Sequence, residues 1–234
     1  MEHSEKWTLG RNLAKRDLAG RKTLDSGEFK TMKDLDPRWD KACASSFIFD
    51  EATEAGLKER VVNELQKIAD GLGIKLFLVG RDYPIHATIQ YGFTVEEDAD
   101  KRSAQYGKVY ADAELAKSTE SALGQMIEFK YLRIHDGIIT IDAIGLSPEL
   151  LKMREEFNRA AEENAVTPIT RDNVLHISIA QLTDVPEQDK KRIFGELKQA
   201  LIKLRHEISA HPIEMKIDHV FNGSDLMYRN RDEL

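Results

Sequence analysis

RDYPIHATI at residues 81–89 returns in altered form as RDNVLHISI at residues 171–179, ninety residues later. Each stretch is a basic-acidic pair followed by His-x-Thr or His-x-Ser within an apolar run. Side chains alternate across a β-strand, so residues two apart share one face. Each stretch therefore places an imidazole beside a hydroxyl, and two such strands can build one site.

The segments that follow these two stretches repeat as well. Residues 127–130 (IEFK) and 134–137 (IHDG) are matched by residues 213–216 (IEMK) and 220–223 (VFNG), at an offset of 86 throughout. Asp-Gly and Asn-Gly between apolar runs are strong signals for a tight hairpin, because a type I′ turn needs positive φ at both central positions. Both halves of the chain are therefore expected to contain a hairpin at this dipeptide.

Apolar residues at helical spacing and short apolar runs predict the remaining elements. The predicted helices span residues 57–69, 95–123, 150–161 and 186–206, and the predicted strands span residues 46–49 and 138–144. The predicted fold class is α+β, in which duplicated βα units form two pseudo-symmetric lobes of largely antiparallel sheet. Helices are expected on the outer faces and a cleft between the lobes.

The start of the chain differs from the rest. Residues 1–44 have no counterpart in the second half and contain few apolar anchors. They are expected to form an N-terminal extension, either a partly ordered segment packed on one lobe or a lid or partner-binding segment. Residues 45–234 are expected to form one bilobal domain, with lobes built from repeats at about 45–145 and 138–228.

Composition limits the classes of protein and partner. A chain of 234 residues with 41% apolar residues is long enough to bury a core. Cys43 is the only cysteine, and no stretch has the apolar character of a membrane span or a signal peptide, so we expect a cytoplasmic protein without a membrane partner. The net charge of -7 does not favour a long nucleic acid as a partner. Nothing in the sequence identifies a protein partner.

His86 and His176 carry the side chain whose ordinary pKa, about 6.5, lets one copy be neutral while another is charged. This suits paired catalysis, in which a general base takes a proton from the attacking oxygen and a general acid gives one to the leaving oxygen. In-line cleavage of a phosphodiester places those oxygens on opposite sides of phosphorus. The hydroxyls of Thr88 and Ser178 are expected to donate to the non-bridging phosphate oxygens.

The motifs HATI at residues 86–89 and HISI at residues 176–179 resemble the paired motifs of the two-histidine (2H) phosphoesterase superfamily, which includes 2′-5′ RNA ligase-like proteins and cyclic nucleotide phosphodiesterases. The resemblance covers about residues 45–228. It implies a bilobal α+β duplication in which both histidines are catalytic, the two hydroxyls hold the phosphate, and no metal or other cofactor is needed. Ser178 stands where threonine is commoner in that family, and the N-terminal extension departs further, since many members begin almost directly with the first strand.

The implied function is a metal-independent phosphodiesterase that hydrolyses a 2′,3′-cyclic phosphate or a related 2′-linked phosphodiester. The low net charge favours a small nucleotide or an RNA-terminal cyclic phosphate as the substrate. The alternative is a non-catalytic nucleotide-binding or scaffold protein of the same fold, which needs no matched acid and base. The remaining histidines show no His-x-His, His-x-x-x-His or Cys/His ligand spacing, so the sequence predicts no metal site.

Five further residues are weaker candidates for substrate binding: Arg81, Tyr83, Gln90, Arg171 and Tyr228. The arginines can neutralise phosphate or pair with surface groups. The tyrosines can stack on a base or simply pack. Gln90 shares strand parity with His86 and is expected to face the cleft unless a bulge intervenes, whereas Gln181 has the opposite parity to His176 and is expected to be structural.

Overall fold

A computed structural model of the protein describes residues 42–223 except residues 83, 136–137, 144, 170–173 and 186. The first strand begins at Ala42, slightly before the expected start of the bilobal domain at Ser45. Most of the expected N-terminal extension and the first expected hairpin turn, at 136–137, lie outside the described residues.

The described part of the chain contains both strands and helices, interspersed along the sequence. The strands are β1 (Ala42–Phe49), β2 (Lys75–Leu78), β3 (His86–Phe93), β4 (Met126–His135), β5 (Ile138–Ala143), β6 (Thr167–Pro168), β7 (His176–Asp184) and β8 (Ile213–Gly223). The helices are α2 (Glu51–Leu57), η3 (Lys58–Val62), α3 (Asn63–Leu72), α4 (Ala99–Tyr110), α5 (Ala113–Ala122), α6 (Pro148–Glu163), η4 (Glu187–Asp189) and α7 (Lys190–Ala210). The sequence-predicted helices at 150–161 and 186–206 correspond to α6 and α7, and the one at 57–69 lies within the continuous run from α2 to α3.

Helix ends follow local sequence signals. Asp50 caps α2 by accepting hydrogen bonds from two backbone N–H groups of its first turn, and Ser147 caps α6, whose first residue is Pro148. Gly73 ends α3 with φ 66°, a left-handed conformation that a residue without a Cβ adopts at little cost.

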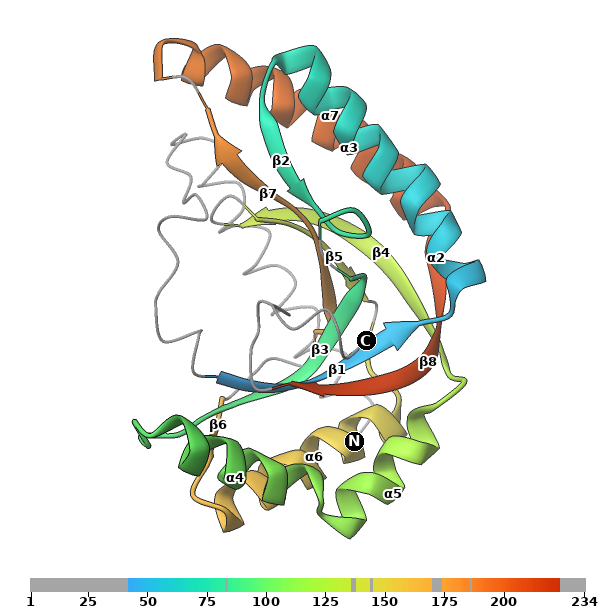
Figure 1. Ribbon diagram of the computed structural model, residues 1–234. Coiled ribbons are helices and arrows are strands. Elements are labelled where there is room, and N and C mark those ends of the chain that lie inside the picture. The colour runs from blue at the N-terminus through green and yellow to red at the C-terminus, as the bar shows by residue number, and fades with distance from the viewer. Residues whose placement is uncertain are drawn as a thin grey trace, which may run out of the picture.

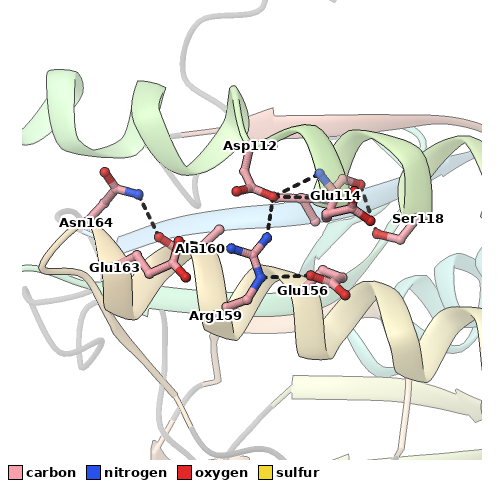
Figure 2. A network of polar contacts seen from close by, with 9 residues as sticks. Asp112, Glu114, Ser118, Glu156, Arg159, Ala160, Glu163 and Asn164 are labelled. Atoms are coloured by element: carbon pink, nitrogen blue, oxygen red, sulfur yellow. Dashed lines mark hydrogen bonds and ion pairs between the residues drawn. The ribbon is translucent and has the colours of Figure 1, made fainter.

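The single helix predicted for residues 95–123 is wrong, because Asp112 divides it into α4 and α5. Asp112 has extended backbone angles, and its carboxylate accepts hydrogen bonds from the backbone N–H groups of Glu114 and Leu115. The same carboxylate accepts a hydrogen bond from Arg159 of α6 at 2.6 Å (Figure 2). A short acidic side chain here caps a new helix more favourably than it continues the old one.

Within the described residues, the strands form one eight-stranded sheet in the order β2-β7-β5-β4-β8-β1-β3-β6, and the neighbouring strands are antiparallel. The order is pseudo-symmetric about the β4–β8 pair, since β4, β5 and β7 on one side match β8, β1 and β3 on the other. An additional pairing of Ala87 with Ile177 joins β3 directly to β7. The predicted α+β class with two largely antiparallel lobes is confirmed.

One of the two predicted hairpins is confirmed. Strands β4 and β5 pair in antiparallel register, with His135 opposite Ile138. The hairpin expected at Asn222-Gly223 is wrong, because β8 continues through both residues and pairs with β1, with Asn222 opposite Ser45. The Asn222 side chain also accepts a hydrogen bond from Ser45 Oγ at 2.6 Å, so this dipeptide serves pairing between distant strands.

Helices cover one face of the curved sheet. Figure 1 shows α2, α3 and α7 outside one part of the sheet and α4, α5 and α6 outside the other. Phe47, Ala87, Ile141 and Ile177 are fully buried in the apolar core on the helix-covered face. Their neighbours along the strands point to the opposite face, here called the site face. The site face is defined by Ser46, His86, Thr88, Thr140, Asp142, His176 and Ser178.

Candidate active site

The two histidine motifs meet where β3 pairs with β7. Ala87 and Ile177, the middle residues of the motifs, lie opposite each other in antiparallel register, and both are fully buried. Because the strands are antiparallel, moving one residue along each strand from this pair places each histidine level with the hydroxyl residue of the other motif. The resulting neighbours across the two strands are His86 with Ser178 and Thr88 with His176. All four residues named by sequence reasoning thus share one patch of the site face.

The ring of His86 is held in one tautomer. Its Nδ1 lies 2.9 Å from the carbonyl oxygen of Pro84. A carbonyl can only accept, so Nδ1 carries the hydrogen and Nε2 carries the lone pair of the neutral ring. The side chain is half-buried, and loss of hydration lowers the pKa of His86 to about 4, with the bond to Pro84 opposing the shift. His86 is therefore neutral at pH 7.

The hydroxyl of Thr88 is anchored by a residue that sequence reasoning missed. Ser46 of β1 lies opposite Thr88, and their hydroxyl oxygens are 3.0 Å apart within the buried part of the molecule. The only hint in the sequence is a pair of serines inside an otherwise apolar strand, Ser45 and Ser46. A buried hydroxyl needs a partner, and here the partner is a candidate phosphate ligand.

His176 has a buried carboxylate opposite it. Asp142 of β5 is the cross-strand partner of His176 and is fully buried. The backbone N–H of Ala143 donates to the carbonyl of Leu175 at 2.8 Å, and this bond flanks the pair on one side. The pair is therefore of the non-hydrogen-bonded type, in which the two side chains lie closest together.

Asp142 belongs to a polar group that sequence reasoning also missed. Its Oδ2 lies 2.7 Å from Nε of Arg133 on β4, close enough for an ion pair although the N–H is not aimed for a hydrogen bond. Its Oδ1 accepts a hydrogen bond from the hydroxyl of Thr140 at 3.2 Å, and Thr140 lies opposite Ser178. The Arg133 guanidinium sits 5.5 Å from the ring centre of Tyr131. The signal available in the sequence was a basic residue, Arg133, and an acidic residue, Asp142, each within a largely apolar stretch.

A bulge reverses the expected orientation of Gln90. The register of β3 against β1 shifts between Thr88 and Gln90, which leaves Ile89 as the extra residue. Gln90 therefore points to the helix-covered face, where its side-chain nitrogen donates to Asn158 of α6 at 2.6 Å and to the carbonyl of Ile169 at 2.8 Å. The expectation that Gln90 faces the histidines depended on a regular strand.

The equivalent bulge in β7 has the opposite consequence for Gln181. The register of β7 against β5 shifts so that Ile179 is the extra residue, and Gln181 lies opposite Ile138. Ile138 shares the face of Thr140, two residues along the regular strand β5. Gln181, expected to be structural, therefore points to the same face as the histidines.

Arg81 lies at the surface. Its side chain is 52% exposed, forms an ion pair with Asp82 at 2.8 Å and donates to the carbonyl of Leu76. These contacts match the surface-pairing alternative for this residue. The other weak candidates lie outside the described residues: Tyr83, Arg171 and Tyr228.

Two further findings concern the described part of the chain alone. No three histidine, cysteine or acidic side chains in it come together as a group of metal ligands. None of its helices combines the length and apolar character needed to cross a membrane.

Comparisons with known proteins give similarity in structure only. No family model matches the chain, and no curated protein matches it. The ns2 PDE domain of MHV is 14% identical, with a TM-score of 0.41 over 61% of this chain and 84% of that one. Usb1 of Kluyveromyces marxianus with uridine monophosphate is 8% identical, with a TM-score of 0.47 over 81% and 97%. A conserved protein of unknown function from Agrobacterium tumefaciens is 12% identical, with a TM-score of 0.49 over 87% and 94%. At such values these similarities do not by themselves assign a family or an activity.

Proposed function

We propose that this protein is a metal-independent phosphodiesterase of the two-histidine type, which hydrolyses a 2′,3′-cyclic phosphate or a related 2′-linked phosphodiester of a nucleotide or RNA end. One observation carries the proposal: the pairing of Ala87 with Ile177, which sets two His-x-Thr/Ser motifs side by side on one face. A site with two imidazoles and two hydroxyls supplies both proton transfers and the phosphate contacts that this reaction needs. The net charge of -7 supports a small substrate.

The reaction adds water across one P–O bond. One imidazole takes a proton from the attacking water as its oxygen bonds to phosphorus. The bond from phosphorus to the ribose oxygen breaks on the opposite side, and that oxygen takes a proton from the second imidazole. The net change is one water consumed, and solvent restores the protonation of both rings. Each transfer typically accelerates the reaction by about 10² to 10⁴.

The hydroxyls act on the phosphate rather than on the proton. Non-bridging oxygens accept hydrogen bonds, so Thr88 and Ser178 can donate to them as charge develops in the transition state. The contact from Ser46 restricts the rotamer of Thr88, and a donor held in place loses less entropy when the phosphate binds.

The test is turnover in the presence of a chelator. The substrates are 2′,3′-cyclic mononucleotides, a short RNA ending in a cyclic phosphate and a 2′-5′-linked dinucleotide. Wild type should hydrolyse at least one of them, and the His86→Ala/His176→Ala variant none. His206→Ala, which removes an exposed histidine of α7, is the matched control and should behave as wild type. Nucleotide-dependent thermal stabilisation without any product would instead favour the binding-protein alternative.

A further inference from the structure

The two halves of the site differ in the residue opposite each histidine: Ile48 lies opposite His86, and Asp142 lies opposite His176. We propose that Asp142 is a positioning residue that orients His176 and favours its protonated form, so that His176 is the general acid and His86 the general base. This assignment of roles rests on the proposed phosphodiesterase function.

The surroundings of Asp142 favour its ionised form. It is fully buried, where an isolated carboxylate would be strongly disfavoured. Arg133 provides a cation 2.7 Å from Oδ2, and the Thr140 hydroxyl donates to Oδ1. A carboxylate offers about four acceptor positions, so it can accept from an imidazole N–H as well as from these groups. Asp142 is thus a fixed negative charge on the site face.

This charge acts more strongly on His176 than the compensating Arg133 does. Asp142 is directly opposite His176 on the adjacent strand, whereas Arg133 is one strand further away and opposite Thr140. A carboxylate within about 4 to 6 Å favours the charged form of its neighbour. Among the described residues, the other group level with His176 is the neutral Thr88 of β3.

Within the described strands, the positions level with His86 hold no carboxylate. The residues level with it are Ile48 of β1 and Ser178 of β7, and beyond Ile48 lies His219 of β8, an exposed ring 2.9 Å from the exposed Asp218. Burial keeps His86 neutral, and the bond from Nδ1 to Pro84 leaves Nε2 as the basic nitrogen. A neutral ring that presents a lone pair is the form that a general base requires.

A purely structural role for the Asp142–Arg133 pair is the competing interpretation. The pseudo-symmetric position in the other lobe is Ile48, so a strand of this sheet packs there without any charge. Replacing a buried ion pair by apolar residues is often neutral for stability. The fold itself therefore does not account for a carboxylate opposite one histidine and not the other.

Substrates with different leaving groups distinguish the catalytic roles of the two histidines. A 2′-5′-linked dinucleotide expels an alkoxide that must be protonated, whereas the p-nitrophenyl ester of a nucleoside 2′-phosphate expels an anion that needs no proton. We expect His86→Ala to be slow on both substrates. His176→Ala and Asp142→Asn should be slow on the dinucleotide, the latter by about 10- to 10³-fold, and should recover to within about tenfold of wild type on the ester. Recovery of His86→Ala in place of His176→Ala would reverse the assignment.

A titration of the His176 ring by NMR tests Asp142 without relying on activity. Asp142→Asn should lower the pKa of His176 by about 1 to 3 and leave His86 unchanged. Asp218→Asn, which alters an exposed carboxylate beside another histidine, should change neither ring. If Asp142→Asn does not fold, Asp142→Asn/Arg133→Met removes both charges and should lower the pKa of His176 by a smaller amount, because the opposing cation is lost as well. An unchanged pKa of His176 in a folded variant overturns this inference even if the enzyme is active. Absence of wild-type turnover on every phosphodiester removes the proposed function itself.

Discussion

The two lobes carry the same histidine and hydroxyl pattern on equivalent strands but support it with different chemistry. In the first lobe, Ser46 anchors the hydroxyl of Thr88 and an apolar residue lies opposite the histidine. In the second lobe, the equivalent hydroxyl, Thr140, is directed to the carboxylate of Asp142, which lies opposite the histidine. A duplicated fold can therefore give one half to a base and the other to an acid while the backbone stays pseudo-symmetric.

The largest expected effect comes from removing either histidine. His86→Ala and His176→Ala should each lower kcat on a 2′-linked dinucleotide by about 10² to 10⁴, because each removes one proton transfer. The double variant should lose less than the product of the two factors, since the two groups act in one transition state. Steady-state kinetics measures these losses of kcat, with His206→Ala as the control. Unequal losses would show which histidine contributes more to the rate, and wild-type rates in both single variants would contradict the shared site.

The hydroxyls come next. Thr88→Val and Ser178→Ala should each lower kcat by about 10² to 10³, the usual loss for one donor to a developing charge. Ser46→Ala should cost less, about tenfold, because Thr88 keeps its hydroxyl and loses only its anchor. Ser121→Ala, at an exposed serine of α5 whose hydroxyl donates to the carbonyl of Ser118 in the same helix, is the control for loss of a hydroxyl. Equal losses for Ser46→Ala and Thr88→Val would mean that Ser46 itself contacts the phosphate.

Acid should reveal the unusual environment of His86 in stability as well as in rate. Burial lowers the pKa of His86 to about 4, so below the unfolded value of about 6.5 the unfolded chain binds a proton that the folded chain does not. This contribution to stability is fully present above about pH 6.5 and is lost as the pH falls toward about 4. Denaturant unfolding between pH 7 and pH 4 should show a steeper loss for wild type than for His86→Asn. Parallel curves would mean that the ring is protonated in the folded protein as readily as in the unfolded chain.

Sequence reasoning found the repeat, the two histidine motifs and the fold class, because strand alternation and helical spacing are local properties. The repeat in the sequence aligns Ile127 with Ile213. In the structure both strands carry a bulge at an equivalent place. Phe129, which lies opposite Ala143, is therefore equivalent to Ile217, which lies opposite Phe49. The offset between these strands is therefore 88 rather than 86, and this explains why Asn222-Gly223 does not form a turn.

Bulges and strand neighbours are set by tertiary packing, which alternation alone does not contain. One extra residue at Ile89 turned Gln90 away from the site, and its counterpart at Ile179 turned Gln181 toward it. The pairing of Asp142 with His176 joins different repeats, so no local pattern could predict it.

The two lobes also differ in the helices that follow the histidine strands β3 and β7, and this difference has the smallest expected effect. The second lobe spans this connection largely with α7, a helix of 21 residues, whereas Asp112 breaks the first into α4 and α5. Asp112→Ala should reduce the free energy of unfolding by about 1 kcal/mol, the usual cost of losing an N-cap, and leave kcat unchanged. Hydrogen bonds from the Leu115 N–H and from Arg159 hold the pKa of Asp112 below its ordinary value.

The lowered pKa of Asp112 determines how its contribution to the free energy of unfolding changes with pH. The contribution of Asp112 is present above its unfolded pKa, about 3.9, and disappears as the pH falls through the folded value. The difference between wild type and Asp112→Ala should therefore be largest at neutral pH and shrink in acid. Asp100→Ala, in the first turn of α4 but not its cap, is the control. A difference that persists at pH 2 would show that the break depends on the backbone conformation at this position rather than on the charge of the cap.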